Sequence, residues 1–382
     1  MDLRDSPEAA AFRTEARAFL DAHAPEDAIN TYRADVDEEI AVERSTAWQR
    51  TLHEHGWAAI TWPEEAGGRG LGPVEQIIWN QELARAGVTQ SLFMVGVEMV
   101  GPTLIVHGTP EQKEHHLEPI LSGEHVWCQL LSEPGAGSDL AGLHTRAVRD
   151  GDEWVVNGQK VWSSGAHYSH YGILLARTDP EVPKHQGITC FACPMSAPGV
   201  EARPLRQMTG GAHFNEVFLT DARIPDSHRI GPVNEGWNVA RTLLANERMA
   251  LSGAEGAFSF DELAAAVRAH PDRVDAIVRD RVAGLYANVR TLDFLNARVI
   301  TKLGRGETPT AEASIMKLKL ARIVTDGATL ALALLGPAGM LDENGEARRF
   351  VAWPAMHIGG GTDEVNKNIV AERVLGLPRD PA

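Results

Sequence analysis

The spacing of apolar residues predicts helices at both ends of the chain and β-strands in the middle. Apolar side chains recur on one helical face after Ser6-Pro7, a pair that is typical of a helix start. Thr109-Pro110-Glu111-Gln112 repeats this signal, and its glutamine is placed to complete a capping box. Glycine, proline and tryptophan crowd residues 56–73, which predicts an irregular loop between helices.

From about Val126 the apolar period changes to two, which predicts strands separated by Asp-Gly, Asn-Gly and proline-rich breaks. The predicted strands are Val126–Leu131, Thr145–Val148, Trp154–Val156, Gln159–Trp162, Gly172–Arg177, Gly187–Cys193, Ala202–Leu205 and Glu216–Leu219. Asn157-Gly158 is predicted to be the turn between two of them. After Gly236 the pattern is helical again. The predicted helices are Trp237–Gly253, Phe260–Ala269, Arg273–Leu303, Ala311–Leu335 and Thr362–Leu375.

This order predicts an α+β fold of three domains. An N-terminal helical domain would cover residues 1–125, a central antiparallel β domain 126–236, and a C-terminal helical bundle 237–382. The formal net charge of −16 argues against a sequence-independent nucleic-acid binder, which needs a basic surface. No uninterrupted apolar run approaches the ~18 residues that a membrane span needs. The polar start Met1–Ser6 does not resemble a signal peptide, so we expect a cytoplasmic protein without membrane insertion.

The cysteines and histidines do not predict a metal or disulfide site. Cys190 and Cys193 have the spacing of a redox or metal motif, but they fall on a predicted strand, where residues three apart point to opposite faces. The pairs His115-His116 and His53/His55 have no carboxylate or cysteine at ligand spacing. We therefore expect no metal ligands.

A glycine-rich turn, Gly135-Ala136-Gly137-Ser138-Asp139, directly follows the first predicted strand. Glycines allow main-chain N–H groups to approach a ligand closely. Ser132, Ser138 and Ser164 add hydroxyl groups, and Trp162 adds a flat aromatic face. These groups suit a planar, hydrogen-bonding heterocycle such as a flavin, although an ordinary surface hairpin would give the same spacing.

The run Ser132–Asp139 together with Trp162-Ser163-Ser164 resembles the flavin-binding stretch of acyl-CoA dehydrogenases. The segments 55–68 and Gly359–Thr362 resemble two further elements of that family, so the resemblance spans nearly the whole chain. It implies that the central β domain and the C-terminal bundle enclose FAD. It also implies an oxidoreductase of lipid metabolism, in fatty acid or steroid degradation. Its implied partners are an acyl-CoA substrate, an electron-transferring flavoprotein, and further subunits in a homotetramer or a heterotetramer.

The reaction that the resemblance implies needs a carboxylate base, which removes the α-proton of an acyl thioester. Many members carry this base in a Tyr-Glu-Gly-Thr element, but the matching residues here are Gly359–Thr362, so that glutamate is absent. Other members carry the base on the helix that opens the C-terminal bundle, where Glu247 matches. Apolar neighbours such as Leu243 and Met249 would raise its pKa. The alternative is a surface glutamate paired with Arg248 or with a residue one turn away.

The resemblance further implies that the Gly360 N–H bonds the thioester carbonyl, together with a flavin hydroxyl. The residues that it implies for cofactor contact are Gln129, Leu131, Ser132, Ser138, Trp162, Ser164, Thr362 and Glu364. Thr362 and Glu364 fit equally well as the N-cap and first turn of the last helix.

Two family elements are missing. An Arg-x-x-Phe-Gly element that reaches the partner subunit's FAD should fall near Ala265–Arg268, and a Gln-x-x-Gly-Gly element is replaced by Ala333–Pro337. These departures leave open which residues make the adenine-side contacts and whether a different chain supplies them. The leading hypothesis is a dehydrogenase of branched or bulky acyl-CoA, such as a steroid side chain. A flavin oxidase or monooxygenase, a non-catalytic partner subunit, and an unrelated ligand-binding module are the alternatives.

Overall fold

The computed structural model describes residues 5–25, 38–90, 92–252, 258–303, 305, 307, 311–341 and 345–379. The chain forms two compact units. Unit 1 consists of Met1–Arg17, Pro73–Gly87 and Leu251–Ala382, and unit 2 consists of Ala18–Gly72 and Val88–Ala250. The predicted domain boundaries after residues 125 and 236 stay a prediction.

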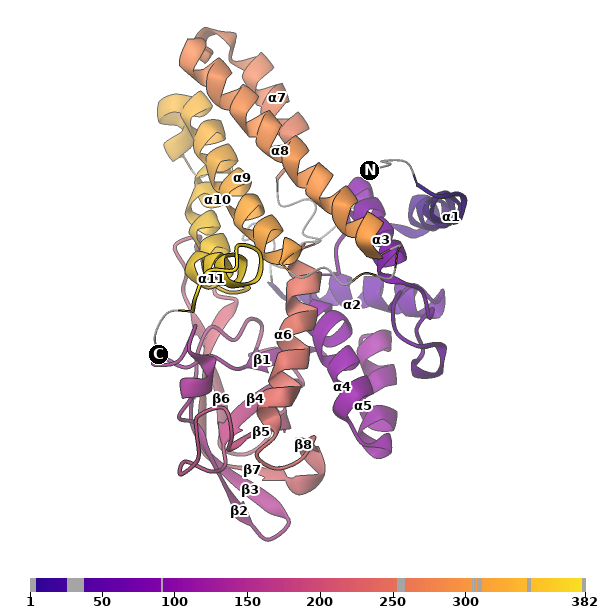
Figure 1. The fold of residues 1–382 in the computed structure, drawn as a ribbon, viewed down its shortest axis with the longest axis vertical. Helices are drawn as coiled ribbons and strands as arrows, with labels where there is room; N and C mark the ends of the chain where they lie inside the picture. The colour runs from indigo at the N-terminus through magenta and orange to yellow at the C-terminus, as the bar shows by residue number, and fades with distance from the viewer. Residues whose placement is uncertain are drawn as a thin grey trace. The chain divides into compact units, whose positions relative to one another are not determined.

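Unit 2 contains one sheet of eight strands in the order β6-β7-β3-β2-β4-β5-β8, with β1 added beside β4 (Figure 1). The strands are β1 Trp127–Leu130, β2 Arg146–Asp150, β3 Glu153–Lys160, β4 Tyr171–Arg177, β5 Ile188–Pro194, β6 Val200–Leu205, β7 Phe214–Pro225 and β8 Arg229–Ile230. Most pairs are antiparallel, as predicted, but β4 runs parallel to β1 and, through one residue pair, to β2. One face of the sheet carries a core that includes Leu174, Phe191 and Val217.

Asn157-Gly158 is not the predicted turn but an irregularity inside β3, where the register with β7 shifts. A Cβ atom at Gly158 would lie 2.7 Å from the Cα of Thr145, so only glycine fits beside that backbone. Asn157 donates to Asp221 Oδ1 at 3.0 Å and accepts from the Asp221 N–H at 2.9 Å. The two strands predicted on either side are therefore one strand, and Trp162 lies beyond its end.

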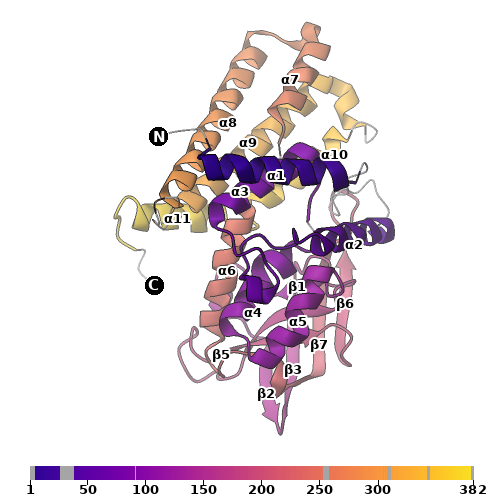
Figure 2. The ribbon, with the colours of Figure 1, turned by 90° about the vertical axis from the view of Figure 1, so that its right-hand side faces the viewer.

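The helices of unit 2 precede and follow the sheet. They are α2 Glu38–Glu54, the π-helix η2 Val95–Val100, α4 Gly101–His107, α5 Pro110–Ser122 and α6 Gly236–Ser252. Figure 2 shows α4 and α5 next to one another. The capping box predicted at Thr109 and Gln112 is confirmed, since each side chain bonds the other residue's N–H.

A tryptophan side chain completes the hydrogen bonding of the π-helix η2. The Gly101 N–H bonds the carbonyl of Gly96, five residues earlier. The same pattern would pair the carbonyl of Val97 with Pro102, which has no N–H. The indole of Trp62 supplies the missing donor at 2.9 Å. Because the Trp62 ring occupies the space that a Cβ at Gly101 would need, glycine is required there.

Unit 1 is helical within the described residues. Its helices are the first part of α1 Pro7–His23, α3 Pro73–Ala86, α7 Phe260–Ala269, α8 Ala276–Leu303, α9 Glu312–Leu335, α10 Glu346–Ala352 and α11 Asp363–Arg373. Ser6 caps α1 through a 3.2 Å bond from the Ala9 N–H, as predicted. Figure 1 shows α8 and α9 side by side, and their apolar faces share a core that includes Leu285 and Ile323.

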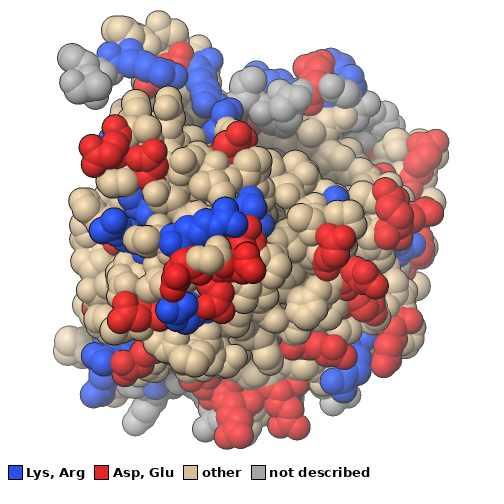
Figure 3. All heavy atoms as spheres, turned by 90° about the horizontal axis from the view of Figure 1, so that it is seen from below, with Lys and Arg blue, Asp and Glu red and all other residues tan. Residues whose placement is uncertain are grey.

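Helix α9 and the turn after it, Glu312–Met340, are apolar and long enough to cross a membrane by composition alone. The mean hydropathy of the most apolar window is 1.4. In unit 1, α9 buries residues such as Val324 and Leu330, and 39% of its most apolar window is buried. Acidic and basic side chains lie among one another on the face in Figure 3. That mixture gives this face no broad basic field of the kind that nucleic acid selects.

Candidate functional site

Glu247, the predicted base, lies half-buried on α6. Its Oε2 accepts a hydrogen bond from Gln129 Nε2 at 3.3 Å, and the same nitrogen lies 3.5 Å from Met99 Sδ. Three elements of unit 2, α6, β1 and η2, therefore meet at the side-chain amide of Gln129. The bond from Gln129 orients the carboxylate, which is what a general base requires. The predicted contact with Met249 and the alternative pairing with Arg248 involve side chains outside the described part of the chain.

The sequence predicts only cofactor contact for Gln129, and the structure adds its side-chain bond to Glu247. Residues 118 positions apart give no spacing signal, so only the fold reveals this pair. A second carboxyl group, Glu98, lies next to Met99 on η2. Burial raises its pKa to about 7, so both protonation states are populated at neutral pH. π-Helical turns are frequent at functional sites.

The turn after β1 is closed by two backbone bonds of 3.0 Å between Glu133 and Ala136. A Cβ atom at Gly135 or Gly137 would meet no atom within 4 Å, so both glycines face open space. The predicted close approach of a ligand to these glycines stays a prediction, with space free for it on the turn. Ser138 is exposed beside these glycines.

A buried ion pair, Lys160–Glu133, anchors this turn to the end of β3. Lys160 is fully buried at the end of β3, and its Nζ donates to Glu133 Oε1 at 2.8 Å and to the Leu131 carbonyl at 3.0 Å. The carboxylate of Glu133 also accepts the N–H groups of His144 and Thr145. Burial lowers the pKa of Lys160 to about 8 despite the opposing attraction of Glu133, so the pair stays charged at pH 7. Sequence spacing gave no sign of this pair.

Trp162 is held in a strained and exposed conformation. Its φ of 62° is left-handed, which is costly for a bulky residue, and 62% of the residue is exposed. The next residue, Ser163, is fixed by two bonds to Asn215, at 3.1 Å and 3.0 Å. The ring packs edge-on against Phe214 and leaves a face open to solvent. Strain of this kind commonly marks a binding site.

Open backbone donors surround this tryptophan. Within the described residues, the N–H groups of Ser132, Trp162 and Ser164 have no acceptor. The carbonyl of Ser132 accepts the Val161 N–H at 2.9 Å, so the end of β1 and the return segment lie side by side. An exposed indole, open N–H groups and unobstructed glycines fit a planar heterocycle with acceptor atoms, such as the flavin of FAD.

The Gly359–Thr362 segment belongs to unit 1 and forms a tight turn before α11. Gly360 and Gly361 have φ of 67° and 85°, where glycine is strongly preferred. The buried amide of Asn366 donates to the carbonyls of Gly361 at 2.9 Å and Thr362 at 3.1 Å. The N–H groups of Gly360 and Gly361 have no acceptor among the residues described. The turn therefore presents two unused donors of the kind that polarise a carbonyl.

Thr362 is the N-cap of α11, since its hydroxyl accepts the Val365 N–H at 3.2 Å. Glu364 is exposed in the first turn of that helix. The capping interpretation is thus confirmed for Thr362, and contact of both residues with FAD stays a prediction. The segment Ala265–Arg268 lies on α7, and Ala333–Pro337 covers the end of α9.

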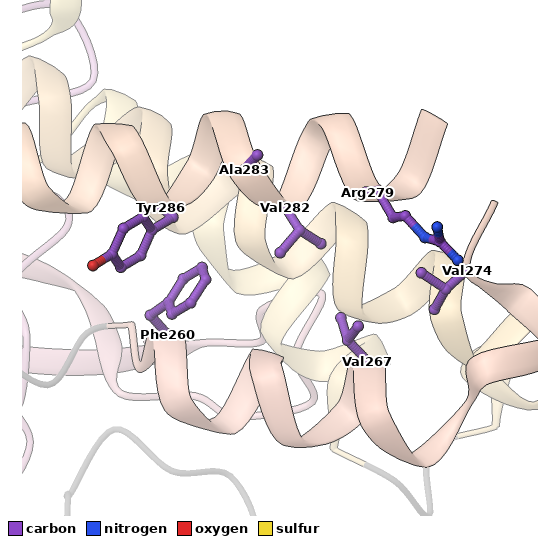
Figure 4. A pocket seen from close by; sticks show the side chains of 7 residues that line it. All are labelled: Phe260, Val267, Val274, Arg279, Val282, Ala283 and Tyr286. Carbon is purple, nitrogen blue, oxygen red and sulfur yellow. The ribbon is translucent and has the colours of Figure 1, made fainter. Parts of the chain in front are cut away.

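Unit 1 has an apolar groove of about 290 Å³ between α7 and α8 (Figure 4). Phe260, Val267, Val282 and Tyr286 line it, and Arg279 lies at one end. Most of its apolar residues also pack on the core of unit 1. It contains none of the predicted site residues.

The cysteines are inert in this fold. Burial raises the pKa of the Cys128 thiol to about 12, and it raises those of Cys190 and Cys193 further. Among the described residues, no three His, Cys, Asp or Glu side chains are grouped to hold a metal ion.

Comparisons with known proteins agree along the whole chain. Residues 6–124 match the model for "Acyl-CoA dehydrogenase, N-terminal domain", residues 128–222 that for the middle domain, and residues 234–375 that for the C-terminal domain. Acyl-CoA dehydrogenase FadE34 of Mycobacterium tuberculosis is 41% identical over 89% of this chain, which spans 47% of FadE34. Acyl-CoA dehydrogenase IpdE1 of the same organism is 38% identical, covering 89% of this chain and 90% of IpdE1.

Two solved structures share the fold over the full length of both chains. The "Tcur3481-Tcur3483 steroid ACAD" has a TM-score of 0.86 at 32% identity. The ChsE4-ChsE5 complex from Mycobacterium tuberculosis has a TM-score of 0.84 at 30% identity. The predicted arrangement of helical, β and helical segments is therefore confirmed.

Proposed function

Because the chain belongs to the acyl-CoA dehydrogenase family, we propose that it is an FAD-dependent enzyme that desaturates the α,β-bond of an acyl-CoA thioester with Glu247 as its base. The bond from Gln129 to Glu247 is the observation that carries this assignment. It supports a carboxylate that is oriented and half-buried, instead of a solvated helix glutamate.

The reaction divides between this chain and its cofactor. Bound FAD supplies the acceptor for the hydride that leaves the β-carbon. Glu247 takes the α-proton and becomes a neutral carboxylic acid, so substrate loses one proton and one hydride. Trp162 and the open N–H groups of Ser132 and Ser164 hold the flavin. The Gly360 N–H stabilises the negative charge that develops on the thioester oxygen.

We further propose a branched or bulky acyl group, of which a steroid side chain is an example. This proposal is supported by the name of one similar structure, which contains "steroid ACAD". The electrons would pass to an electron-transferring flavoprotein, as the family resemblance implies.

The assembly that we propose is a heterotetramer. This chain lacks the Arg-x-x-Phe-Gly element near Ala265–Arg268, so it lacks the usual contact to a partner's FAD. The two similar structures are both named after two different chains. A second chain with that arginine would complete the cofactor site.

The test is the visible spectrum of the purified chain, alone and after co-expression with family members from its own genome. Anaerobic addition of acyl-CoAs follows. A yellow protein that bleaches supports the dehydrogenase, and colour only after co-expression supports the mixed assembly. A yellow protein that no thioester bleaches refutes the proposed reaction. Bleaching followed by oxygen consumption and hydrogen peroxide release would favour an oxidase.

A further inference from the structure

Four side chains of unit 1 form a hydrogen-bonded chain beside the Gly359–Thr362 turn. His357 Nδ1 lies 2.8 Å from Asp363 Oδ2, and its Nε2 lies 2.9 Å from Thr325 Oγ1 on α9. Lys317 Nζ, also on α9, lies 3.3 Å from Asp363 Oδ1. His357 precedes the turn and Asp363 follows it, so both ends of the turn are tied to the same helix.

The donors and acceptors of these side chains match. With a proton on Nδ1, the His357 ring donates to Asp363, and its Nε2 accepts the hydroxyl proton of Thr325. Burial pushes the pKa of Asp363 upward, but the bonds from His357 and Lys317 outweigh it and hold that pKa below its usual value. Asp363 therefore remains a carboxylate that accepts from both neighbours.

These hydrogen bonds matter because three consecutive glycines are hard to hold in one conformation. Glycine loses more backbone freedom on ordering than any other residue. Asn366 fixes the Gly361 carbonyl, but it holds only the second half of the turn. In the first half, the N–H groups of Ile358 and Gly359 bond the Ala355 carbonyl at 3.0 Å and 2.9 Å, and His357 ties the same segment to Thr325 on α9.

We propose that His357 and Asp363 are positioning residues, which clamp the turn on α9 and aim the Gly360 N–H group at the substrate carbonyl. This inference rests on the proposed function, since the carbonyl is that of the acyl-CoA thioester. Neither side chain takes a proton from substrate. Misplacement of catalytic groups by about 1 Å costs roughly 10²-fold in rate. We therefore expect about 10- to 100-fold slower flavin reduction when the clamp is opened.

The variants are His357→Ala, Asp363→Asn and the double variant, with Asp326→Asn as matched control. Asp326 is on α9 as well, but it is exposed and pairs only loosely with Arg322 at 3.4 Å. Each is studied as the FAD-loaded enzyme, with its partner chain if one is needed. Anaerobic stopped-flow mixing gives the reduction rate at saturating thioester and, separately, the thioester affinity.

The clamp predicts slow reduction in both single variants, thioester affinity within about threefold, and no change in Asp326→Asn. The double variant should be no slower than the slower single variant, because both residues act through one turn. If His357→Ala does not fold, the isosteric Asp363→Asn still carries the test. Rates within twofold of the unmodified enzyme in Asp363→Asn would overturn the proposal.

A second readout separates the clamp from general stability. In a 3-thia-acyl-CoA, sulfur replaces the β-carbon, so the thioester can lose its α-proton but has no hydride to give. Its enolate next to oxidised flavin therefore gives a long-wavelength absorbance band. The clamp predicts that this band needs a pH about one unit higher in both variants, and that amides 358–362 exchange hydrogen faster. If the variants show the enolate band at the same pH as the unmodified enzyme and the same amide exchange, the clamp is refuted but the proposed function is not. An unmodified enzyme that binds FAD but shows neither band nor reduction would refute the proposed function, and the clamp with it.

Discussion

The buried Lys160–Glu133 pair gives the sharpest prediction about the cofactor turn. Lys160→Met keeps the length of the side chain and removes its charge, which leaves the carboxylate of Glu133 buried without its ammonium partner. Removing one member of a buried ion pair typically destabilises a protein by about 3–5 kcal/mol. The carboxylate keeps its bonds from His144 and Thr145, so we expect the lower half of that range, about 3 kcal/mol.

The assay is thermal unfolding of the FAD-loaded protein, together with its flavin content. With an unfolding entropy of about 2.1 cal/mol/K per residue, a loss of 3 kcal/mol lowers the Tm of this 382-residue chain by roughly 4 °C. Because Lys160 also holds the Leu131 carbonyl, the flavin should be released more easily. The matched control is Lys184→Met, which breaks the exposed pair with Asp139 and should cost less than about 1 kcal/mol. A Tm for Lys160→Met within 2 °C of the unmodified protein would refute the argument.

Three further predictions concern single residues. Gly101→Ala forces a methyl group into the ring of Trp62 and should lower the free energy of unfolding by about 1–3 kcal/mol or more. The control Gly284→Ala, in open space on α8, should raise it by up to about 1 kcal/mol. Tm values compare the two variants. Burial and the neighbouring histidines lower the pKa of His116 from 6.5 to about 3. Between these pH values His116 binds a proton only when the protein unfolds. The free energy of unfolding is therefore fully retained above pH 6.5 and decreases as the pH is lowered, by about 2 kcal/mol at pH 5. Urea midpoints at pH 7 and pH 5 should show the loss, and His116→Gln should reduce it. Trp162→Gly relieves a left-handed φ, so the FAD-free Tm should not fall, while FAD affinity, measured by flavin fluorescence, should weaken about tenfold.

Local signals in the sequence predicted the elements well. The start of α1 at Ser6-Pro7 and the capping box at Thr109 depend on a few adjacent residues, so they can be recognised without the fold. Asn157-Gly158 gave a wrong prediction because that prediction, too, used only adjacent residues. The pair is a good turn signal locally, but Thr145 on the neighbouring chain segment makes this glycine necessary inside a strand. Tertiary contacts of this kind are invisible to local patterns.

The candidate site divides in the same way. Glu247 was predicted from a resemblance, and the structure adds the Gln129 side chain that orients it. The Lys160–Glu133 pair and the His357–Asp363 pair have no spacing rule. The first joins residues 27 positions apart by burial of opposite charges, and the second is completed by α9. Sequence patterns can identify residues that carry out chemistry, whereas the residues that position them can be identified only from tertiary contacts.

The central claim is that Glu247 is the base, and Glu247→Gln tests it most directly. The variant keeps the size of the side chain and can still pair with Gln129, but its amide cannot accept the α-proton at neutral pH. The measurement is anaerobic loss of flavin absorbance after addition of the acyl-CoA that best bleaches the unmodified enzyme. We predict that Glu247→Gln binds FAD normally and that its reduction rate falls roughly 10²- to 10⁴-fold, in line with loss of general-base catalysis. Bleaching at a rate within tenfold of the unmodified enzyme would contradict the account.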